Sequence, residues 1–166
     1  YVPLYHDEYA VVLSSLALGA FESQDATLAG TLAVASLTEN DQALKLSPNN
    51  VNVWKSRTKI FYALSTIDPT YLPQAIVALL KAQTLSPSDP KISYNLAILY
   101  GKLGDSQKAV DNLLESKRLK PNYRDAYYAL SIFYNETKEP IKAKAIITEY
   151  LTTVDSTDAE FKKLVE

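Results

Sequence analysis

The side chains that most often carry out chemistry are scarce in this sequence. The chain has one histidine, His6, and no cysteine among its 166 residues. A Ser-His-Asp triad, a thiol nucleophile or a cysteine-ligated metal site therefore has almost nothing from which to be built. His6–Glu8 places three possible metal ligands side by side, but consecutive residues point around a helix rather than toward one ion. With only four glycines and no phosphate-binding loop, we expect no catalytic residue, no metal, no cofactor and no enzyme.

Charge and hydrophobicity narrow the possible partners. Seventeen basic and 19 acidic side chains give a net charge of −2, which is too balanced for a general nucleic-acid binder. The apolar content of 47% is sufficient for a folded core, and no run approaches the roughly 18 apolar residues of a membrane span. Residues 51–120 carry ten bases and five acids, whereas residues 1–50 carry one base and six acids. The middle of the chain is therefore locally basic.

Three five-residue segments of the sequence resemble one another, and each ends in proline. They are Leu44–Pro48, Gln83–Pro87 and Lys117–Pro121, and their prolines lie 39 and 34 residues apart. Because proline cannot continue a helix, each segment should end one, and the Asn or Asp that follows should cap the next. Asp89 before Pro90 is the pairing expected at a helix start, and Gly104-Asp105 should separate two helices. The period therefore predicts a series of helical hairpins.

The residues inside each period resemble the tetratricopeptide repeat, a 34-residue unit of two antiparallel helices. The residues that fill its aromatic, small and closing positions are Ala97, Tyr100, Ala109, Leu113 and Pro121 in the middle unit, Trp54, Ala75, Leu79, Ala82 and Pro87 in the preceding unit, and Tyr127, Leu130, Tyr134 and Ala143 in the last. The resemblance implies an all-α fold, a right-handed solenoid of antiparallel helix hairpins in which Trp54 is substantially buried. Arg57 stands where the family has Leu, so it either extends its charged head into solvent or pairs with a carboxylate or an anionic ligand.

The resemblance also divides the chain. Residues 1–50 should form a longer helical hairpin, either a degenerate repeat or an N-terminal cap. Three repeats should follow over residues 51–155, as 51–89, 90–123 and 124–155, with five extra residues of the first placed in a turn at Ser65–Pro73. Thr157–Glu160 matches a capping box, so residues 156–166 should start a helix that covers the open face of the last repeat.

Proteins of this family bind peptides in a concave groove lined by the first helices of their hairpins, and the resemblance implies the same groove here. The residues expected on that side are Asn52, Lys55, Lys59, Tyr62, Lys91, Tyr94, Asn95, Ile98, Lys102, Tyr128 and Asn135. The lysines would attract an acidic peptide and the tyrosines would supply apolar contact area, unless the tyrosines pack between neighbouring helices. The carboxylate clamp of some family members is not reproduced, because Lys59, Asp125 and Ala129 stand where it needs Asn, Lys and Arg.

The leading functional hypothesis is a non-enzymatic scaffold that binds a protein or peptide partner in this groove. We expect no nucleic-acid partner and no insertion of this domain into a membrane, and self-association through tyrosine-rich or terminal surfaces is an alternative. The runs Val53–Leu64, Ile92–Gly101 and Asn122–Ala129 also resemble, more weakly, repeats that trail bacterial membrane glycan polymerases or ligases. That resemblance implies a regulatory or scaffolding tail of a membrane-bound enzyme, and the sequence assigns no compartment.

Overall fold

The computed structural model describes residues 2–164. Within that range the chain forms helices joined by short turns, with no strand. The helices are α1 (Val2–Glu22), α2 (Ala26–Leu46), α3 (Val51–Leu64), α4 (Tyr71–Leu85), α5 (Pro90–Lys102), α6 (Ser106–Leu119), α7 (Arg124–Glu136), α8 (Pro140–Thr153) and α9 (Ala159–Lys163). The all-α prediction is confirmed.

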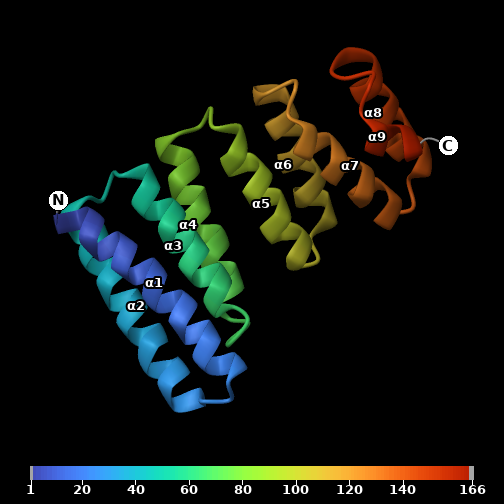
Figure 1. Ribbon diagram of the computed structural model, residues 1–166. Coiled ribbons are helices and arrows are strands. Elements are labelled where there is room, and N and C mark those ends of the chain that lie inside the picture. The colour runs from blue at the N-terminus through green and yellow to red at the C-terminus, as the bar shows by residue number, and fades with distance from the viewer. Residues whose placement is uncertain (1, 165–166) are drawn as a thin grey trace. The chain divides into compact units, whose positions relative to one another are not determined.

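Two compact units make up the chain, Tyr1–Pro87 and Ser88–Glu166. In the first unit, α1 and α2 form a long hairpin and α3 and α4 form a shorter one (Figure 1). In the second unit, α5 pairs with α6, α7 pairs with α8, and α9 contacts α8 (Figure 1). The predicted arrangement of antiparallel hairpins is thus confirmed within each unit, and the finer division into cap and repeats stays a prediction.

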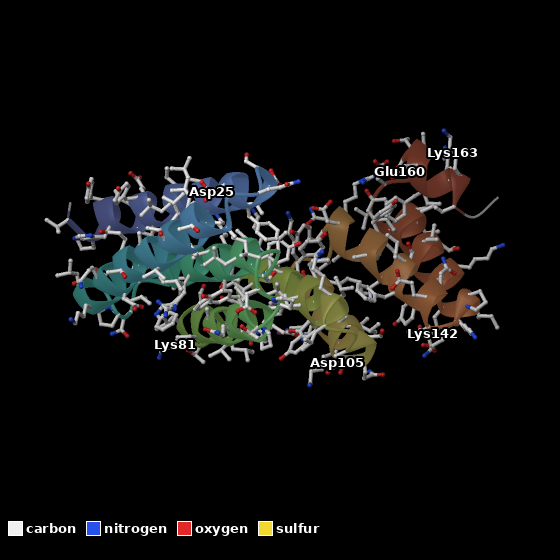
Figure 2. All side chains as sticks on the ribbon, turned by 90° about the horizontal axis from the view of Figure 1, so that it is seen from below. Asp25, Lys81, Asp105, Lys142, Glu160 and Lys163 are labelled. Atoms are coloured by element: carbon white, nitrogen blue, oxygen red, sulfur yellow. The ribbon has the colours of Figure 1, made fainter. Side chains whose placement is uncertain are left out.

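Short polar side chains begin most of these helices, because the first backbone N–H groups of a helix have no partner within it. Asp89 accepts a hydrogen bond from Lys91 N and Asp105 accepts one from Lys108 N, as the sequence predicted. Asp25 accepts in the same way from Leu28 N, and it is labelled with Asp105 in Figure 2. Gly104, which immediately precedes Asp105, has a φ of 85°, a backbone conformation that residues with a side chain rarely adopt.

Two details of the sequence prediction were wrong. Helix α4 begins at Tyr71, so Pro73 lies in its first turn rather than in the preceding turn. Proline fits there because N–H groups of the first turn need no intrahelical acceptor. The N-cap of α9 is Asp158 rather than Thr157, because the Thr157 hydroxyl donates to Asp155 Oδ1 at 2.6 Å instead.

Small side chains let the helices of the first unit approach one another. One core cluster brings together Ala10 and Ala17 of α1, Ala33 of α2, and Ile60 and Leu64 of α3, all buried. With so little side-chain volume between them, the two long helices pack closely and also contact α3.

A buried polar chain joins the same three helices. The Asp7 carboxylate on α1 accepts hydrogen bonds from Ser56 Oγ of α3 at 2.8 Å and from Asn40 Nδ2 of α2 at 3.4 Å. Burial raises the pKa of the Asp7 carboxyl above its ordinary value, although these hydrogen bonds act in the opposite direction. The network fixes how α1, α2 and α3 align, because any shift would leave a buried polar group without its partner.

Aromatic rings dominate the core of the second unit. Tyr127, Tyr134, Tyr150 and Phe161 are buried together with aliphatic residues of α6, α7 and α8. The Phe161 ring of α9 lies 4.0 Å from the Tyr150 ring, centroid to centroid, in a stacked arrangement. Helix α9 is therefore held to the last hairpin by a fully buried side chain.

Candidate functional site

The predicted groove residues of the first unit lie on one face of α3, which we call the α3 stripe. It consists of Asn52, Lys55, Lys59 and Tyr62, and all but the partly buried Lys55 are exposed. Their spacing of three and four residues aligns them, because a helix turns once every 3.6 residues. Lys59 also acts electrostatically on Asp7, where its positive charge lowers the pKa of the carboxyl in opposition to burial. The stripe thus combines positive charge with one exposed aromatic ring.

In the second unit the predicted residues lie on α5 and α7, and we call this set the α5–α7 face. It consists of Lys91, Tyr94, Asn95, Ile98 and Lys102 on α5 and Tyr128 and Asn135 on α7. Lys91, Asn95, Lys102 and Asn135 are exposed, whereas Tyr94, Ile98 and Tyr128 are partly buried. The set therefore combines exposed polar side chains with partly buried, more apolar ones.

The Tyr94 ring packs against the next hairpin as well as lining the face. Its centroid lies 5.4 Å from that of Tyr123, which immediately precedes α7. Burial, and then the negative charge of Asp125, raise the pKa of the Tyr94 hydroxyl. The end of the face near Asp125 is accordingly less positive than its lysines alone would suggest.

The Phe133 side chain of α7 reaches α5 at Gly101. A Cβ atom at that position would lie 2.3 Å from Cζ of Phe133, which is far inside van der Waals contact. Glycine is therefore needed for the Phe133 ring to lie against α5. This contact and the Tyr94–Tyr123 pair hold the two helices of the face at two points along α5.

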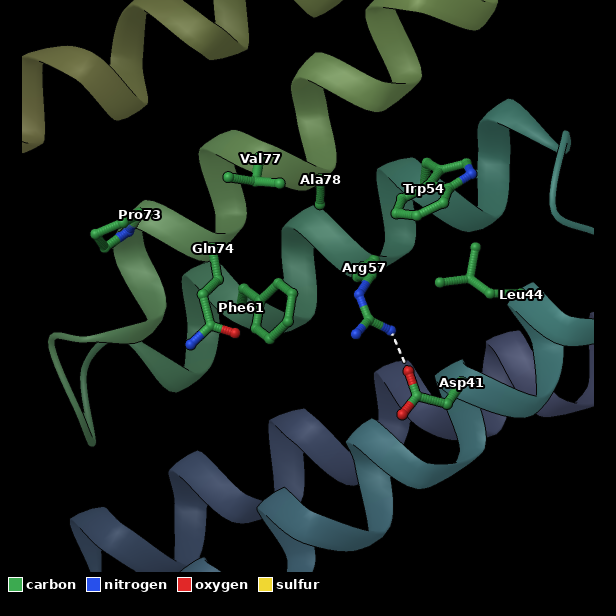
Figure 3. Close-up of a pocket in the computed structure, with 9 residues that line it drawn as sticks. All are labelled: Asp41, Leu44, Trp54, Arg57, Phe61, Pro73, Gln74, Val77 and Ala78. Atoms are coloured by element: carbon green, nitrogen blue, oxygen red, sulfur yellow. Dashed lines mark hydrogen bonds and ion pairs between the residues drawn. The ribbon is translucent and has the colours of Figure 1, made fainter.

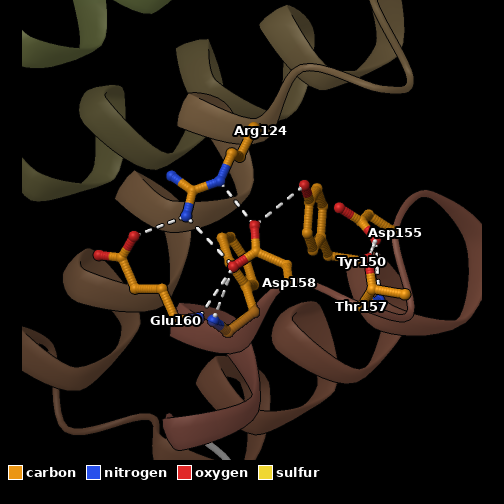
Figure 4. A network of polar contacts seen from close by, with 7 residues as sticks. Arg124, Tyr150, Asp155, Thr157, Asp158 and Glu160 are labelled. Atoms are coloured by element: carbon orange, nitrogen blue, oxygen red, sulfur yellow. Dashed lines mark hydrogen bonds and ion pairs between the residues drawn. The ribbon is translucent and has the colours of Figure 1, made fainter.

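An ion-pair network beside Tyr128 fixes the C-terminal helix (Figure 4). Arg124 Nε donates to Asp158 Oδ2 at 2.7 Å, and Arg124 Nη2 donates to Glu160 Oε2 at 2.6 Å. The Arg124 guanidinium also lies 5.2 Å from the centre of the Phe161 ring, and the Tyr128 ring lies 6.1 Å from the same ring. Hydrogen bonding from Arg124 lowers the pKa of the Asp158 carboxyl to about 2. Arg124 could not be identified from the sequence, because its partners lie 34 and 36 residues away along the chain.

A pocket that the sequence did not predict lies in the first unit, between α2, α3 and α4 (Figure 3). It has a volume of about 530 Å³. We call it the Arg57 pocket, and the residues that line it are Asp41, Leu44, Trp54, Arg57, Phe61, Pro73, Gln74, Val77 and Ala78. A second hollow of about 540 Å³ adjoins it along α2 and shares Asp41 and Leu44 with it. The Arg57 pocket has mostly apolar walls and one guanidinium, whereas the adjoining hollow is lined mostly by polar side chains.

Trp54 is partly buried, and part of its side chain remains exposed. Its indole Nε1 donates to the backbone carbonyl of Pro48 at 2.8 Å, while its ring lines the pocket. Tyr127 of the third repeat makes the corresponding bond, in which its hydroxyl donates to the carbonyl of Pro121 at 3.0 Å. Arg57, whose role the sequence left open, pairs with the Asp41 carboxylate.

No cluster of three or more His, Asp or Glu side chains suited to a metal ion occurs in residues 2–164. Across the same part of the chain, no helix combines the length and apolar character needed to cross a membrane.

Comparison with known proteins supports the repeat family. The sequence model of the tetratricopeptide repeat matches residues 90–123. A crystal structure of MamA protein is similar over 95% of this chain and 79% of that chain, with 20% identity and a TM-score of 0.63. A thermophilic tetratricopeptide repeat protein of Thermus thermophilus is similar over 91% of this chain and 76% of that chain, with 18% identity and a TM-score of 0.64.

A further solved structure is longer than this chain, and the weaker resemblance has no support. A tetratricopeptide repeat protein from Parabacteroides merdae is similar over 95% of this chain but 57% of that chain, with 16% identity and a TM-score of 0.65. No curated protein matches the sequence, and the weaker resemblance to glycan polymerases or ligases is not supported. The chain thus has the fold of tetratricopeptide repeat proteins, and residues 90–123 match the repeat model in sequence.

Proposed function

We propose that this protein is a scaffold that binds an acidic segment of a partner protein. The segment binds on the exposed sides of α3, α5 and α7, each the first helix of its hairpin. Tetratricopeptide repeat folds generally act as interaction modules rather than as enzymes. The observation that carries the proposal is the α5–α7 face, where exposed Lys91 and Lys102 border partly buried Tyr94 and Ile98. A partner can cover such a centre with apolar side chains and place carboxylates near the lysines.

The α3 stripe of the first unit offers the same chemistry. Lys59 and Tyr62 are exposed there and lie one helical turn apart, so one short segment can touch both. Each unit thus presents a basic helix face with at least one aromatic ring. We place the acidic residues of the partner opposite these lysines, and expect their attraction to act mainly on the rate of association.

The test compares charge reversal on the proposed surfaces with the same reversal elsewhere. One variant carries Lys55→Glu and Lys59→Glu, a second carries Lys91→Glu and Lys102→Glu, and a control carries Lys81→Glu and Lys144→Glu on α4 and α8. Fluorescein-labelled, glutamate-rich peptides with one aromatic residue serve as probes, and stopped-flow anisotropy measures association. Thermal unfolding of each variant shows whether it remains folded.

Both surface variants should associate severalfold more slowly than the wild type at low salt. The difference should shrink toward 0.15 M salt, where the Debye length falls to about 8 Å. The control should resemble the wild type. The melting temperatures of the control and of the Lys91→Glu, Lys102→Glu variant should hardly change, because exposed charges contribute little to stability. Equal slowing in the control, or unchanged rates in both surface variants, would contradict the proposal.

Self-association is a second candidate, and a specific feature of α1 favours it. Tyr5, Tyr9, Val12 and Leu16 repeat at helical spacing, and each side chain is between 43% and 62% exposed. A continuous exposed apolar stripe of this kind typically marks an interaction surface. Sedimentation equilibrium of the wild type and of a Tyr9→Ser, Leu16→Ser variant tests it: concentration-dependent dimers lost in the variant would support the candidate, and a wild type that stays monomeric would exclude it.

A further inference from the structure

The Arg57 pocket lies on a different side of α3 from the α3 stripe. Trp54, Arg57 and Phe61 face the pocket, whereas Lys59 and Tyr62 project from the other side of the helix. The pocket is therefore independent of the surfaces proposed above, and a ligand could occupy either without covering the other. Its volume of about 530 Å³ falls within the range of pockets that hold small molecules or peptide side chains.

Internal comparison of the repeats shows that Arg57 is not required by the hairpin. Arg57 follows Pro48 by nine residues, and Leu96 and Leu130 follow Pro87 and Pro121 by the same number. Both leucines are fully buried and contribute to the hydrophobic core, whereas the Arg57 side chain is 20% exposed. The first repeat thus has a charged group, at the wall of an open pocket, where its neighbours have core leucines.

Among residues 2–164, the Arg57 guanidinium donates hydrogen bonds through its Nη1 nitrogen alone. Arg57 Nη1 donates to Asn40 Oδ1 at 3.0 Å and to Asp41 Oδ1 at 2.5 Å. Among the described residues, Nε and Nη2 have no hydrogen-bond acceptor. Figure 3 shows the second terminal nitrogen turned away from Asp41, on the side of the pocket where Phe61 and Gln74 lie. Because Arg57 lines the open pocket, an incoming anion can accept hydrogen bonds from these N–H groups.

Arg124 of the second unit shows what a complete set of partners looks like in this protein. Its guanidinium lies over the Phe161 ring and binds two carboxylates, those of Asp158 and Glu160. The Arg57 guanidinium similarly lies 4.9 Å from the centre of the Phe61 ring but binds one carboxylate, that of Asp41. A second carboxylate can therefore approach Arg57 from the pocket without displacing the first.

The walls of the pocket determine what should accompany that carboxylate. Trp54, Leu44 and Val77 present apolar surface, and the Trp54 N–H is already bonded to Pro48, which leaves the indole ring for packing. An aromatic ring packs well against indole and fills such a volume. The adjoining hollow on α2, which includes Lys45, provides room and positive charge for neighbouring residues of an acidic peptide.

We infer that the Arg57 pocket is a second peptide-binding site, which takes an aromatic side chain next to an acidic residue. The carboxylate of the acidic residue binds the Nε and Nη2 edge of Arg57, and the aromatic ring packs against Trp54. The ligand is a protein segment rather than a free anion, because most of the pocket wall is apolar and a free anion would leave it uncovered.

Trp54 is the only tryptophan of the chain, so its fluorescence reports this pocket without labelling. The probes are capped pentapeptides in which phenylalanine, tyrosine or leucine is flanked by glutamates. Controls replace the glutamates with glutamine or the central residue with alanine, and inorganic phosphate and free acetate test whether an anion alone suffices. Titrations use the wild type, Arg57→Leu, Arg57→Lys and, as a variant of the other side of α3, Lys59→Glu.

We expect a saturable change of Trp54 emission with at least one glutamate-flanked aromatic peptide. Affinity should fall about tenfold or more with the glutamine peptide and in Arg57→Leu, because each removes charge-assisted hydrogen bonds. Arg57→Lys should recover only part of it, since lysine lacks the planar paired donors. Lys59→Glu should leave this titration nearly unchanged while it weakens binding at the α3 stripe, which distinguishes the two sites.

Three results would overturn the inference. The first is the absence of any saturable change with the whole peptide set, while the circular dichroism spectrum shows a folded protein. The second is equal affinity for glutamate and glutamine peptides, and the third is equal affinity of the wild type and a folded Arg57→Leu variant. Because leucine occupies the corresponding position in both other repeats, this variant is expected to fold.

Discussion

The contact between Gly101 and Phe133 provides a sharp test of how the α5–α7 face is assembled. Replacing glycine with alanine inside a helix normally stabilises a protein by up to about 1 kcal/mol, through reduced freedom of the unfolded chain. At Gly101 the new Cβ would lie 2.3 Å from Phe133 Cζ and 2.7 Å from Cε1, so the ring has to move. Forcing extra atoms into a packed contact costs about 1–3 kcal/mol.

Subtracting the normal gain from this cost leaves Gly101→Ala destabilising by about 1 kcal/mol, and by about 2 kcal/mol at most. For a chain of this size, about 1 kcal/mol corresponds to a fall in melting temperature of about 2–4 °C, measurable by circular dichroism. The matched control is Gly30→Ala in α2, where an added Cβ would have no neighbouring atom within 4 Å and the change should stabilise by about 1 kcal/mol.

A double-mutant cycle isolates the clash. In a Phe133→Ala background the obstacle is gone, so Gly101→Ala should then stabilise, and the coupling between the two changes should be about 2 kcal/mol. If Gly101→Ala stabilised the wild type as much as Gly30→Ala does, the Phe133 ring would not lie against α5. A coupling near zero would lead to the same conclusion.

Two further changes test the ends of the fold. Phe161→Ala should lower the free energy of unfolding by about 3 kcal/mol and expose the amides of α9 to hydrogen exchange, because the Phe161 ring is fully buried. The control, Lys163→Ala at an exposed position of the same helix, should change it by less than about 0.5 kcal/mol. Equal effects of the two changes in a urea titration would show that this ring does not anchor α9. Asp7→Asn should raise the melting temperature at pH 7, because burial raises the pKa of the native carboxyl and its charged form therefore disfavours folding. This gain should decline as the pH falls through the native pKa and should disappear below the ordinary value of 3.8, where Asp7 is protonated in both states. A gain independent of pH would contradict the reasoning.

Local rules explain why much of the fold could be predicted from the sequence. Proline after each apolar run ended a helix, and Asp89 and Asp105 capped the next ones, as the structure confirms. Both effects act within about four residues, so they need no knowledge of the rest of the chain. The 34-residue spacing then required antiparallel pairs, because neither helix can bury its apolar side alone.

The candidate surfaces were predictable only in part. Helical periodicity alone places Lys91, Asn95 and Lys102 on one side of α5, and the structure leaves all three exposed. Periodicity could not show that Tyr94 packs on Tyr123 or that Phe133 lies on Gly101, because these contacts depend on how α7 is placed against α5.

Tertiary structure alone decided the features that join distant parts of the chain. Asp7 meets Ser56 across 49 residues, and Arg124 meets Asp158 across 34. The sequence shows that such side chains are charged or polar, but their partners follow from the packing of whole hairpins. The Arg57 pocket has the same origin: periodicity identifies an arginine in a leucine position, and only the positions of α2 and α4 beside α3 leave a cavity in front of it. Helix boundaries are determined by neighbouring residues, whereas cavities and long-range ion pairs depend on the relative positions of several helices, which no short stretch of sequence specifies.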